Sequence, residues 1–237
     1  MKYKKLIRDI LFPPICALCG EVVQINKHGV CDRCRIKLPY ISEPTCFKCG
    51  KEISDETVSL CEDCSKQERN YLRGFPVFNY NEDMQESIVL FKYKNKRMLS
   101  EFYAGEIYKK WAREFERLCI DVLVPVPVSK QKLRKRGYNQ AKLICEKLGE
   151  YMGVPVDDKI LVRTHNTAPM KNLNNQERYN NLKNAFKLKD IQKNYNNFLI
   201  IDDIYTTGAT IDTCTKLFNQ QGKHNIYYAS VCIGKGY

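Results

Sequence analysis

FLIIDDIYTTGAT, residues 198–210, is the stretch of the chain that decides its fold. Its first four residues are apolar, which is typical of a short strand buried on both faces of a parallel sheet. Two carboxylates, Asp202 and Asp203, follow the apolar run, and the residues after Gly208 have helical spacing. Because ligands bind at the carboxyl edge of an open α/β sheet, we expect a binding site where this strand ends.

The turn after the two acids carries the groups that hold a phosphate. Backbone amides at a helix N-terminus, threonine hydroxyls and a glycine that permits close approach form a phosphate cradle. The paired carboxylates would accept hydrogen bonds from the vicinal hydroxyls of a ribose, so the pattern predicts a ribose 5-phosphate site. A purely structural acidic turn is the alternative. The turn consists of Thr206, Thr207, Gly208, Ala209 and Thr210.

Other phosphate-binding motifs do not match this stretch. The sequence has no GxxxxGK for a Walker loop. A dehalogenase-type phosphatase needs its second acid two positions after the first, and Ile204 stands there.

The C-terminal two-thirds of the chain alternates apolar strands with amphipathic helices. A helical pattern also runs from Ile88 through Phe91 and Leu99 toward Trp111. Such alternation indicates a mostly parallel sheet flanked by helices. The predicted strands are 75–80, 121–128, 198–203 and 226–233, and the other predicted helices are 139–152, about 175–186 and 209–220.

Eight of the twelve cysteines form four CxxC pairs that begin every 15 residues. A glycine follows the first and third pairs, in CALCG at 16–20 and CFKCG at 46–50, so the repeat unit is 30 residues. Glycine there allows a positive φ and lets the knuckle amides point at the sulfurs. Two closed, structural zinc sites follow, and a redox role is the alternative for any single pair. The predicted ligand sets are Cys16, Cys19, Cys31 and Cys34, and Cys46, Cys49, Cys61 and Cys64.

Length and composition bound the organisation of the chain. With 237 residues, 43% hydrophobic and 28% charged, it has enough for one sizeable core and a small satellite domain. We predict a double zinc-ribbon domain at 1–70 and an α/β domain at 71–237. The cysteines outside the CxxC pairs are predicted to be small buried residues; they are Cys119, Cys145, Cys214 and Cys232.

The compartment and the class of partner follow from the same composition. The apolar run Ile10 to Phe12 is too short for a signal peptide, and no stretch approaches the roughly 18 uncharged apolar residues of a membrane span. We therefore expect a cytoplasmic protein with reduced cysteines. The formal charge of +12 favours phosphorylated metabolites or nucleic acid as partners, although such a surplus also serves solubility alone.

Three stretches together resemble a known family. IIDDIYTTGAT looks like the PRPP-binding signature of type I phosphoribosyltransferases, PRPP being phosphoribosyl diphosphate. PVPVSKQKLRKRGYNQA at 125–141, LVRTHNTAPMKNLNNQERYNNLKNAF at 161–186 and the double zinc ribbon are similar to the ComF family of competence-associated proteins. The resemblance covers nearly the whole chain, although Met170 stands where that family commonly has glutamine. It implies a type I phosphoribosyltransferase-like fold, preceded by the small zinc-ribbon domain.

The resemblance also implies roles for individual residues. Asp202 and Asp203 would hold the ribose hydroxyls, and the turn from Thr206 to Thr210 would hold the 5-phosphate. In related transferases the loop after the first strand holds pyrophosphate with magnesium, and the basic, acid-free loop here suits a diphosphate. A solvated basic loop is the alternative. The residues assigned to the pyrophosphate are Ser129, Arg134, Arg136 and Gly137.

The segment between 161 and 186 is predicted to close over the substrate. Arg163, Thr167 and Arg178 flank a polar, asparagine-rich stretch, and a lid of this kind would exclude water from a reactive intermediate. An ordinary surface loop is equally compatible with the composition. The candidate catalytic residues are Asp202, Asp203, Arg163 and Arg178.

Three functions are compatible with this sequence. The first is a transferase in which magnesium-bound PRPP loses pyrophosphate and a nitrogen nucleophile attacks the ribose. The second, taken from the resemblance to proteins of natural transformation, is the handling of single-stranded DNA together with the DNA-uptake machinery. Aromatic and basic residues alternate from Phe91 to Arg97, which is typical of single-strand binders but also of a helix packed on a core. The third is a regulator that senses PRPP without turnover.

Overall fold

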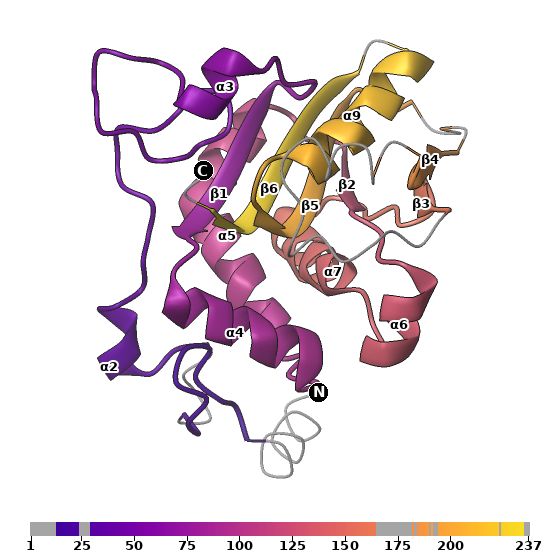
Figure 1. Cartoon of the computed structure of the whole chain (residues 1–237). Helices are drawn as coiled ribbons and strands as arrows, with labels where there is room; N and C mark the ends of the chain where they lie inside the picture. Colours follow the sequence, from indigo (N-terminus) through magenta and orange to yellow (C-terminus); the bar gives the residue numbers. More distant parts are fainter. Residues whose placement is uncertain are drawn as a thin grey trace.

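The computed structural model describes residues 13–23, 29–164, 182, 184–189, 191, 194–222 and 224–234 (Figure 1). In chain order, the elements are α2 (Asp32–Arg35), α3 (Glu62–Lys66), β1 (Arg73–Asn79), α4 (Glu82–Tyr93), α5 (Leu99–Arg117), β2 (Val122–Pro125), α6 (Lys130–Arg136), α7 (Gln140–Met152), β3 (Leu161–Arg163), β4 (Phe186–Leu188), β5 (Asn197–Tyr205), α9 (Ala209–Gln221) and β6 (Asn225–Ile233).

Four of the strands form one parallel sheet in the order β1-β6-β5-β2. β5 lies between β6 and β2, with Ile201 opposite Ala229 on one side and Pro125 on the other. β3 and β4 form a separate antiparallel pair. Because all four strands of the large sheet run the same way, their carboxyl ends meet at one edge. The predicted mostly parallel sheet is therefore confirmed.

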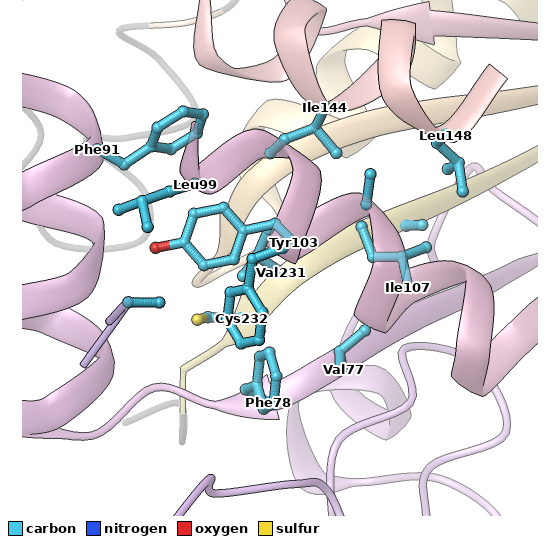
Figure 2. Close-up of a cluster of buried hydrophobic side chains, with 14 of the residues drawn as sticks. Val77, Phe78, Phe91, Leu99, Tyr103, Ile107, Ile144, Leu148, Val231 and Cys232 are labelled. Carbon is cyan, nitrogen blue, oxygen red and sulfur yellow. The ribbon is translucent and has the colours of Figure 1, made fainter. Parts of the chain in front are cut away.

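One face of the sheet is covered by α4, α5, α7 and the first ribbon. Alternate residues of β5, Leu199 and Ile201, belong to this core together with Ile15 and Leu38 of the first ribbon. Figure 2 shows the centre of this core, where Tyr103 of α5 lies among side chains from α4, α7 and two strands. The labelled residues are Val77, Phe78, Phe91, Leu99, Tyr103, Ile107, Ile144, Leu148, Val231 and Cys232.

The opposite face is covered by α9, the β3–β4 pair and the second ribbon. The other residues of β5, Phe198 and Ile200, share this core with Phe218 of α9 and with the four cysteines of the second CxxC set. In Figure 1 α9 lies in front of β5 and β6, whereas α5 and α7 lie on the other side. The sheet is thus a central layer, and each ribbon belongs to a different side of it.

Several predicted elements differ from the structure. The helical pattern from 88 to 111 is two helices, because the chain turns at Asn95, where φ is 53°, before α5 begins. Residues 165–181 of the predicted lid, and with them most of the helix expected near 175–186, lie outside the described residues; Phe186 begins strand β4.

The prediction that Cys119 is buried is wrong. It is exposed, with a φ of 47°, directly after the end of α5. Its backbone is in the left-handed region, so the chain turns away from α5 at this residue and leaves the side chain in solvent. The other three cysteines outside the zinc sets are fully buried, as predicted; they are Cys145, Cys214 and Cys232.

A helix that spans a bilayer needs roughly 20 mostly apolar residues. In the part of the chain that the structure describes, none is long and apolar enough to cross one.

Candidate functional site

A cavity of about 750 Å³ opens at the carboxyl edge of the sheet, where β2 and β5 end. Asp202 and Asp203 line it from β5, and the turn into α9 contributes threonine side chains. Four cationic side chains from α4, α6 and β3 complete its charged lining. The turn residues in the lining are Thr206, Thr207 and Thr210, and the cations are Lys92, Lys132, Arg136 and Arg163.

The two acids occupy different environments within the cavity. Asp203 is buried and forms an ion pair with Lys92, with 2.8 Å between Nζ and Oδ2. The backbone amide of Asp203 donates to Oδ1 of Asp202 at 2.8 Å. Burial, followed by the charge of Asp203, raises the pKa of Asp202 to about 7, although Lys92 opposes this shift. Near neutral pH the carboxyl group of Asp202 is therefore partly protonated.

The turn after β5 presents free backbone donors. Gly208 precedes the thirteen-residue helix α9 with a φ of 81°, a conformation that favours glycine. Among the described residues, the amides of Thr206, Thr207 and Gly208 have no hydrogen-bond partner. Amides at a helix N-terminus attract negative charge. The turn is therefore able to bind an anion.

The cations of α6 form a second polar group. Arg136 donates to Oε1 of Gln140 at 2.8 Å and to the hydroxyl of Tyr93 at 2.9 Å. Burial and then repulsion from Arg163 and Arg136 lower the pKa of Lys132. Cations gathered at this density favour an anionic ligand, which would relieve their mutual repulsion.

The eight cysteines of the CxxC pairs form two clusters on the N-terminal side of the chain. Within each cluster the Sγ atoms lie within 4.8 Å of one another. The glycines after the first and third pairs, Gly20 and Gly50, have φ values of 71° and 74°, as the repeat predicted. Four thiolates at this spacing fit a closed tetrahedral zinc site. The clusters are Cys16, Cys19, Cys31 and Cys34, and Cys46, Cys49, Cys61 and Cys64.

Comparison with known proteins agrees with this arrangement. The sequence model of the double zinc ribbon domain matches residues 7–65. Competence protein F of Haemophilus influenzae is 30% identical over 217 residues, which is 89% of this chain and 93% of that protein. The chain belongs to the ComF family.

Two further relatives are similar over most of the chain. Competence protein ComFC of Bacillus subtilis is 29% identical over 200 residues, 82% of this chain and 79% of that protein. DNA utilization protein YhgH of Escherichia coli is 26% identical over 225 residues, 93% of this chain and 97% of that protein. The similarity therefore spans the ribbons and the α/β part together.

The structure brings some of the residues assigned from the ComF resemblance to the cavity and places others outside it. Arg136 and Arg163 line the cavity, and Arg163 also packs over the Phe186 ring. Ser129 instead caps α6, where its Oγ accepts from the amide of Lys132 at 3.3 Å. Arg134 and Gly137, on the exposed side and at the end of α6, are not part of the lining. Thr167 and Arg178 lie outside the described residues.

Sequence reasoning missed Lys92 as a residue of this cavity. It comes from α4, which carries no motif, and it was interpreted only as part of an aromatic and basic pattern. The available signal is its position four residues after the buried Ile88 and directly after the buried Phe91. A lysine at that helical spacing extends from the packed face toward the sheet edge. Phe91 itself belongs to the core, so the core interpretation of that residue is correct.

Proposed function

We propose that the cavity binds a ribose 5-phosphate that carries a diphosphate, with PRPP as the first candidate. Asp202 and Asp203 accept hydrogen bonds from the ribose hydroxyls, and the turn 206–210 holds the 5-phosphate. The observation that carries the proposal is that the acids, the open turn and four cations all line one cavity. A structural acidic turn would not need the cations around it.

The cations suit the diphosphate end of such a ligand. Lys132, Arg136 and Arg163 would contact its oxygens and stabilise the charge that develops on pyrophosphate as it leaves. Magnesium would arrive with the diphosphate, which supplies oxygen ligands that this ion prefers. Among the described lining residues the carboxylates are Asp202 and Asp203 alone, and we assign these to the ribose.

We further propose that the protein works in DNA uptake, because relatives that match most of the chain are named for competence and DNA utilization. The same cavity would accept the 5-phosphate of a nucleotide. This process and PRPP binding are separate proposals, since a protein of DNA uptake need not carry out phosphoribosyl transfer.

Binding of single-stranded DNA is the second candidate activity, and one surface favours it. Tyr93 is 52% exposed, and the Arg136 guanidinium lies 4.8 Å from its ring centroid. Lys135 approaches the same ring at 6.0 Å. An exposed aromatic ring among cations is a stacking platform for bases. Because Arg136 also lines the cavity, the platform is continuous with the proposed phosphate site.

The binding proposal is tested by calorimetry with PRPP and magnesium. Asp202→Asn and Asp203→Asn should each weaken PRPP binding at least about tenfold, because each removes a charged acceptor for a ribose hydroxyl. Leu133→Ala, on the exposed side of α6 and outside the lining, is the matched control. Unchanged affinity in both aspartate variants would contradict the assignment. Release of pyrophosphate with a panel of amines and bases separates a transferase from a PRPP sensor.

Stability measurements distinguish a binding role of Asp202 from a structural one. Its raised pKa means that ionisation opposes folding, so stability is lost as the pH rises from about 4 toward 7. Asp202→Asn should therefore raise the free energy of unfolding at pH 8 by about 1–2 kcal/mol and leave it nearly unchanged at pH 4. A structural acid that braces the backbone predicts the opposite sign at pH 8. Urea denaturation at the two pH values decides between them.

The DNA proposal needs a separate measurement. Affinity for a single-stranded oligonucleotide should fall steeply with salt, and Tyr93→Ala should weaken it about tenfold while leaving PRPP binding intact. Competition by PRPP against an oligonucleotide with a 5-phosphate, but not against one without it, would place the strand end in the cavity. An oligonucleotide affinity that is unchanged in Tyr93→Ala would exclude a role of this platform in DNA binding.

A further inference from the structure

The phosphate-binding turn rests on a buried layer of three tyrosines. Tyr205, the last residue of β5, stacks on Tyr228 of β6 with ring centroids 4.7 Å apart. Its hydroxyl lies 2.7 Å from the hydroxyl of Tyr71, a residue that comes from the segment between α3 and β1. The ring of Tyr71 also meets Tyr228 edge-on at 4.9 Å. All three side chains are 3% exposed or less.

A buried ion pair joins the same segment to the first turn of α9. Nη1 of Arg69 lies 2.6 Å from Oδ2 of Asp212, and the two side chains are 3% and 1% exposed. The amide of Asn70 donates to the other carboxylate oxygen at 3.3 Å, and its carbonyl accepts from Asn219 at 3.0 Å. Burial raises the pKa of Asp212 even beside the guanidinium. Residues 69–71 therefore contact α9 at two places, at Asp212 in its first turn and at Asn219 further along the helix.

Gly208 shows how closely the turn lies on these groups. A Cβ added there would lie 2.3 Å from the hydroxyl oxygen of Tyr205 and 2.9 Å from Nη1 of Arg69. The turn backbone therefore lies directly against the tyrosine hydroxyl and the guanidinium. Any displacement of either group would move the turn or leave a gap behind it.

The second zinc ribbon lies on the other side of the same layer. The hydroxyl of Tyr228 donates to the carbonyl of Cys49 at 2.8 Å, and Nζ of Lys48 lies 5.6 Å from the centre of the Tyr71 ring. Arg69 follows the last ribbon cysteine, Cys64, by five residues. Ribbon, tyrosines and turn are thus in continuous contact.

We propose that the segment Arg69–Tyr71, which leaves the second zinc ribbon, is a positioning element for the phosphate-binding turn; this rests on the function proposed for that turn. The ribbon fixes the segment, and the segment fixes the turn through Tyr205 and Asp212. The ligand-binding edge is then built jointly by the N-terminal ribbon and the sheet. The described glycines of the first ribbon, Gly20 and Gly29, instead approach Leu90 of α4 and Phe102 of α5.

Two measurements on the full zinc-loaded chain test the proposal. The first is amide hydrogen exchange at Asp212, whose amide donates to the carbonyl of Gly208 at 2.8 Å, with no ligand present. The second is PRPP affinity by calorimetry. Tyr71→Phe, which removes one hydroxyl and keeps the ring, should speed the exchange and weaken PRPP about threefold to tenfold. Tyr205→Phe should do the same, and the double variant should add little because both lose one shared hydrogen bond.

A matched control separates positioning from general destabilisation. Tyr40→Phe also removes one hydroxyl, which donates to Glu106 of α5 at 2.5 Å on the other side of the sheet. It should lower the melting temperature to a similar extent and leave both turn readouts unchanged. Arg69→Lys, which keeps the charge and loses the planar fork, provides a second variant if one tyrosine change has a small effect.

The outcomes are distinguishable. Faster exchange and weaker PRPP binding in Tyr71→Phe but not in Tyr40→Phe support the positioning role. Unchanged exchange at Asp212 in both Tyr71→Phe and Arg69→Lys, or equal changes in Tyr40→Phe, overturn it. If the wild-type chain binds no PRPP, the proposed function fails, and the exchange measurement alone still decides whether the segment holds the turn.

Discussion

The two zinc ribbons share a local structure and differ in their surroundings. In each, the first cysteine accepts at its carbonyl from the knuckle glycine four residues later, at 3.0 Å in the first ribbon and 2.8 Å in the second. In each, a short helix begins after the third cysteine. Yet all four cysteines of the second ribbon are buried, whereas Cys19 is exposed and Cys31 is half-buried in the first. The two ribbons thus have the same local sequence pattern but are buried in the fold to different extents.

An ion pair shows the same difference in burial between the ribbons, with the positions of its acidic and basic residues exchanged. Glu21 pairs with Arg33 at 3.1 Å in the first ribbon, and 30 residues later Lys51 pairs with Asp63 at 2.5 Å in the second. The first pair is about two-thirds exposed, while Lys51 is only 11% exposed. In both ribbons an ion pair therefore joins the first CxxC half to the second, but the acid and the base have exchanged positions. The surroundings of the pair decide what it contributes to stability.

Loss of one cysteine ligand should give the largest difference in stability between the two ribbons. Cys49→Ser should lower the free energy of unfolding by about 4 kcal/mol or more, because it removes a metal ligand from a site packed into the core. Cys19→Ser, at the exposed position, should cost about half as much. Urea denaturation with zinc content measured in parallel tests this. Equal losses would mean that burial of the second ribbon adds nothing to its stability.

Alanine in the two knuckles should give the next largest difference. Both glycines have a positive φ, which costs alanine about 1 kcal/mol. In Gly50→Ala the new Cβ would also meet Pro76 at 2.5 Å, whereas in Gly20→Ala it meets only Leu90 at 3.8 Å. We expect losses of about 3 and about 1 kcal/mol, respectively. Thermal denaturation of the pair measures the difference, and a Gly20→Ala loss as large as that of Gly50→Ala would refute the contact with β1.

Metal removal should proceed from the exposed ribbon first. With a chelator and an alkylating reagent present, Cys19 and Cys31 should be modified at least about tenfold faster than Cys46 and Cys49, because the second site must detach from the sheet before its thiolates are accessible. Mass spectrometry of peptides over time gives the order. Simultaneous modification of both sets would show that the ribbons open together.

The smallest effect is expected from the reversed ion pairs. Lys51→Met should lower the free energy of unfolding by about 1 kcal/mol, since it leaves Asp63 without its partner in a partly buried place. Glu21→Gln should cause no measurable change, because that pair is exposed. The double exchange Lys51→Glu with Asp63→Arg should recover part of the loss. Failure to recover any of it would show that lysine length, rather than pairing, matters.

Much of this contrast could not be predicted from the sequence. The spacing of the CxxC pairs and the glycines after Cys19 and Cys49 predicted both ligand sets, because these contacts are local. The apolar run before Asp202 likewise predicted the central strand. Which side of the sheet each ribbon covers depends instead on contacts between distant residues. Arg69 and Asp212, for example, are 143 positions apart and belong to no common motif.

The residues of the cavity likewise divide into those that the sequence could predict and those that it could not. The acids and the turn could be predicted because one strand and one helix start deliver them together. The opposing cations come from α4, α6 and β3, whose approach is set by packing rather than by spacing. Lys92 could have been favoured from helical periodicity, but its pairing with Asp203 could not. The assigned residues Ser129 and Gly137 instead start and end α6.

The strand order carries a consequence for how the chain assembles. Among the described strands β1 pairs with β6 alone, so residues 73–79 must wait for residues 227–233 before that edge of the sheet exists. During synthesis the ribbons and β1 leave the ribosome well before their partner strand. Closing a loop of that length is slow, and an unpaired strand is open to association with other chains. Nascent chains that lack β6 should therefore depend on zinc and chaperones to remain unaggregated.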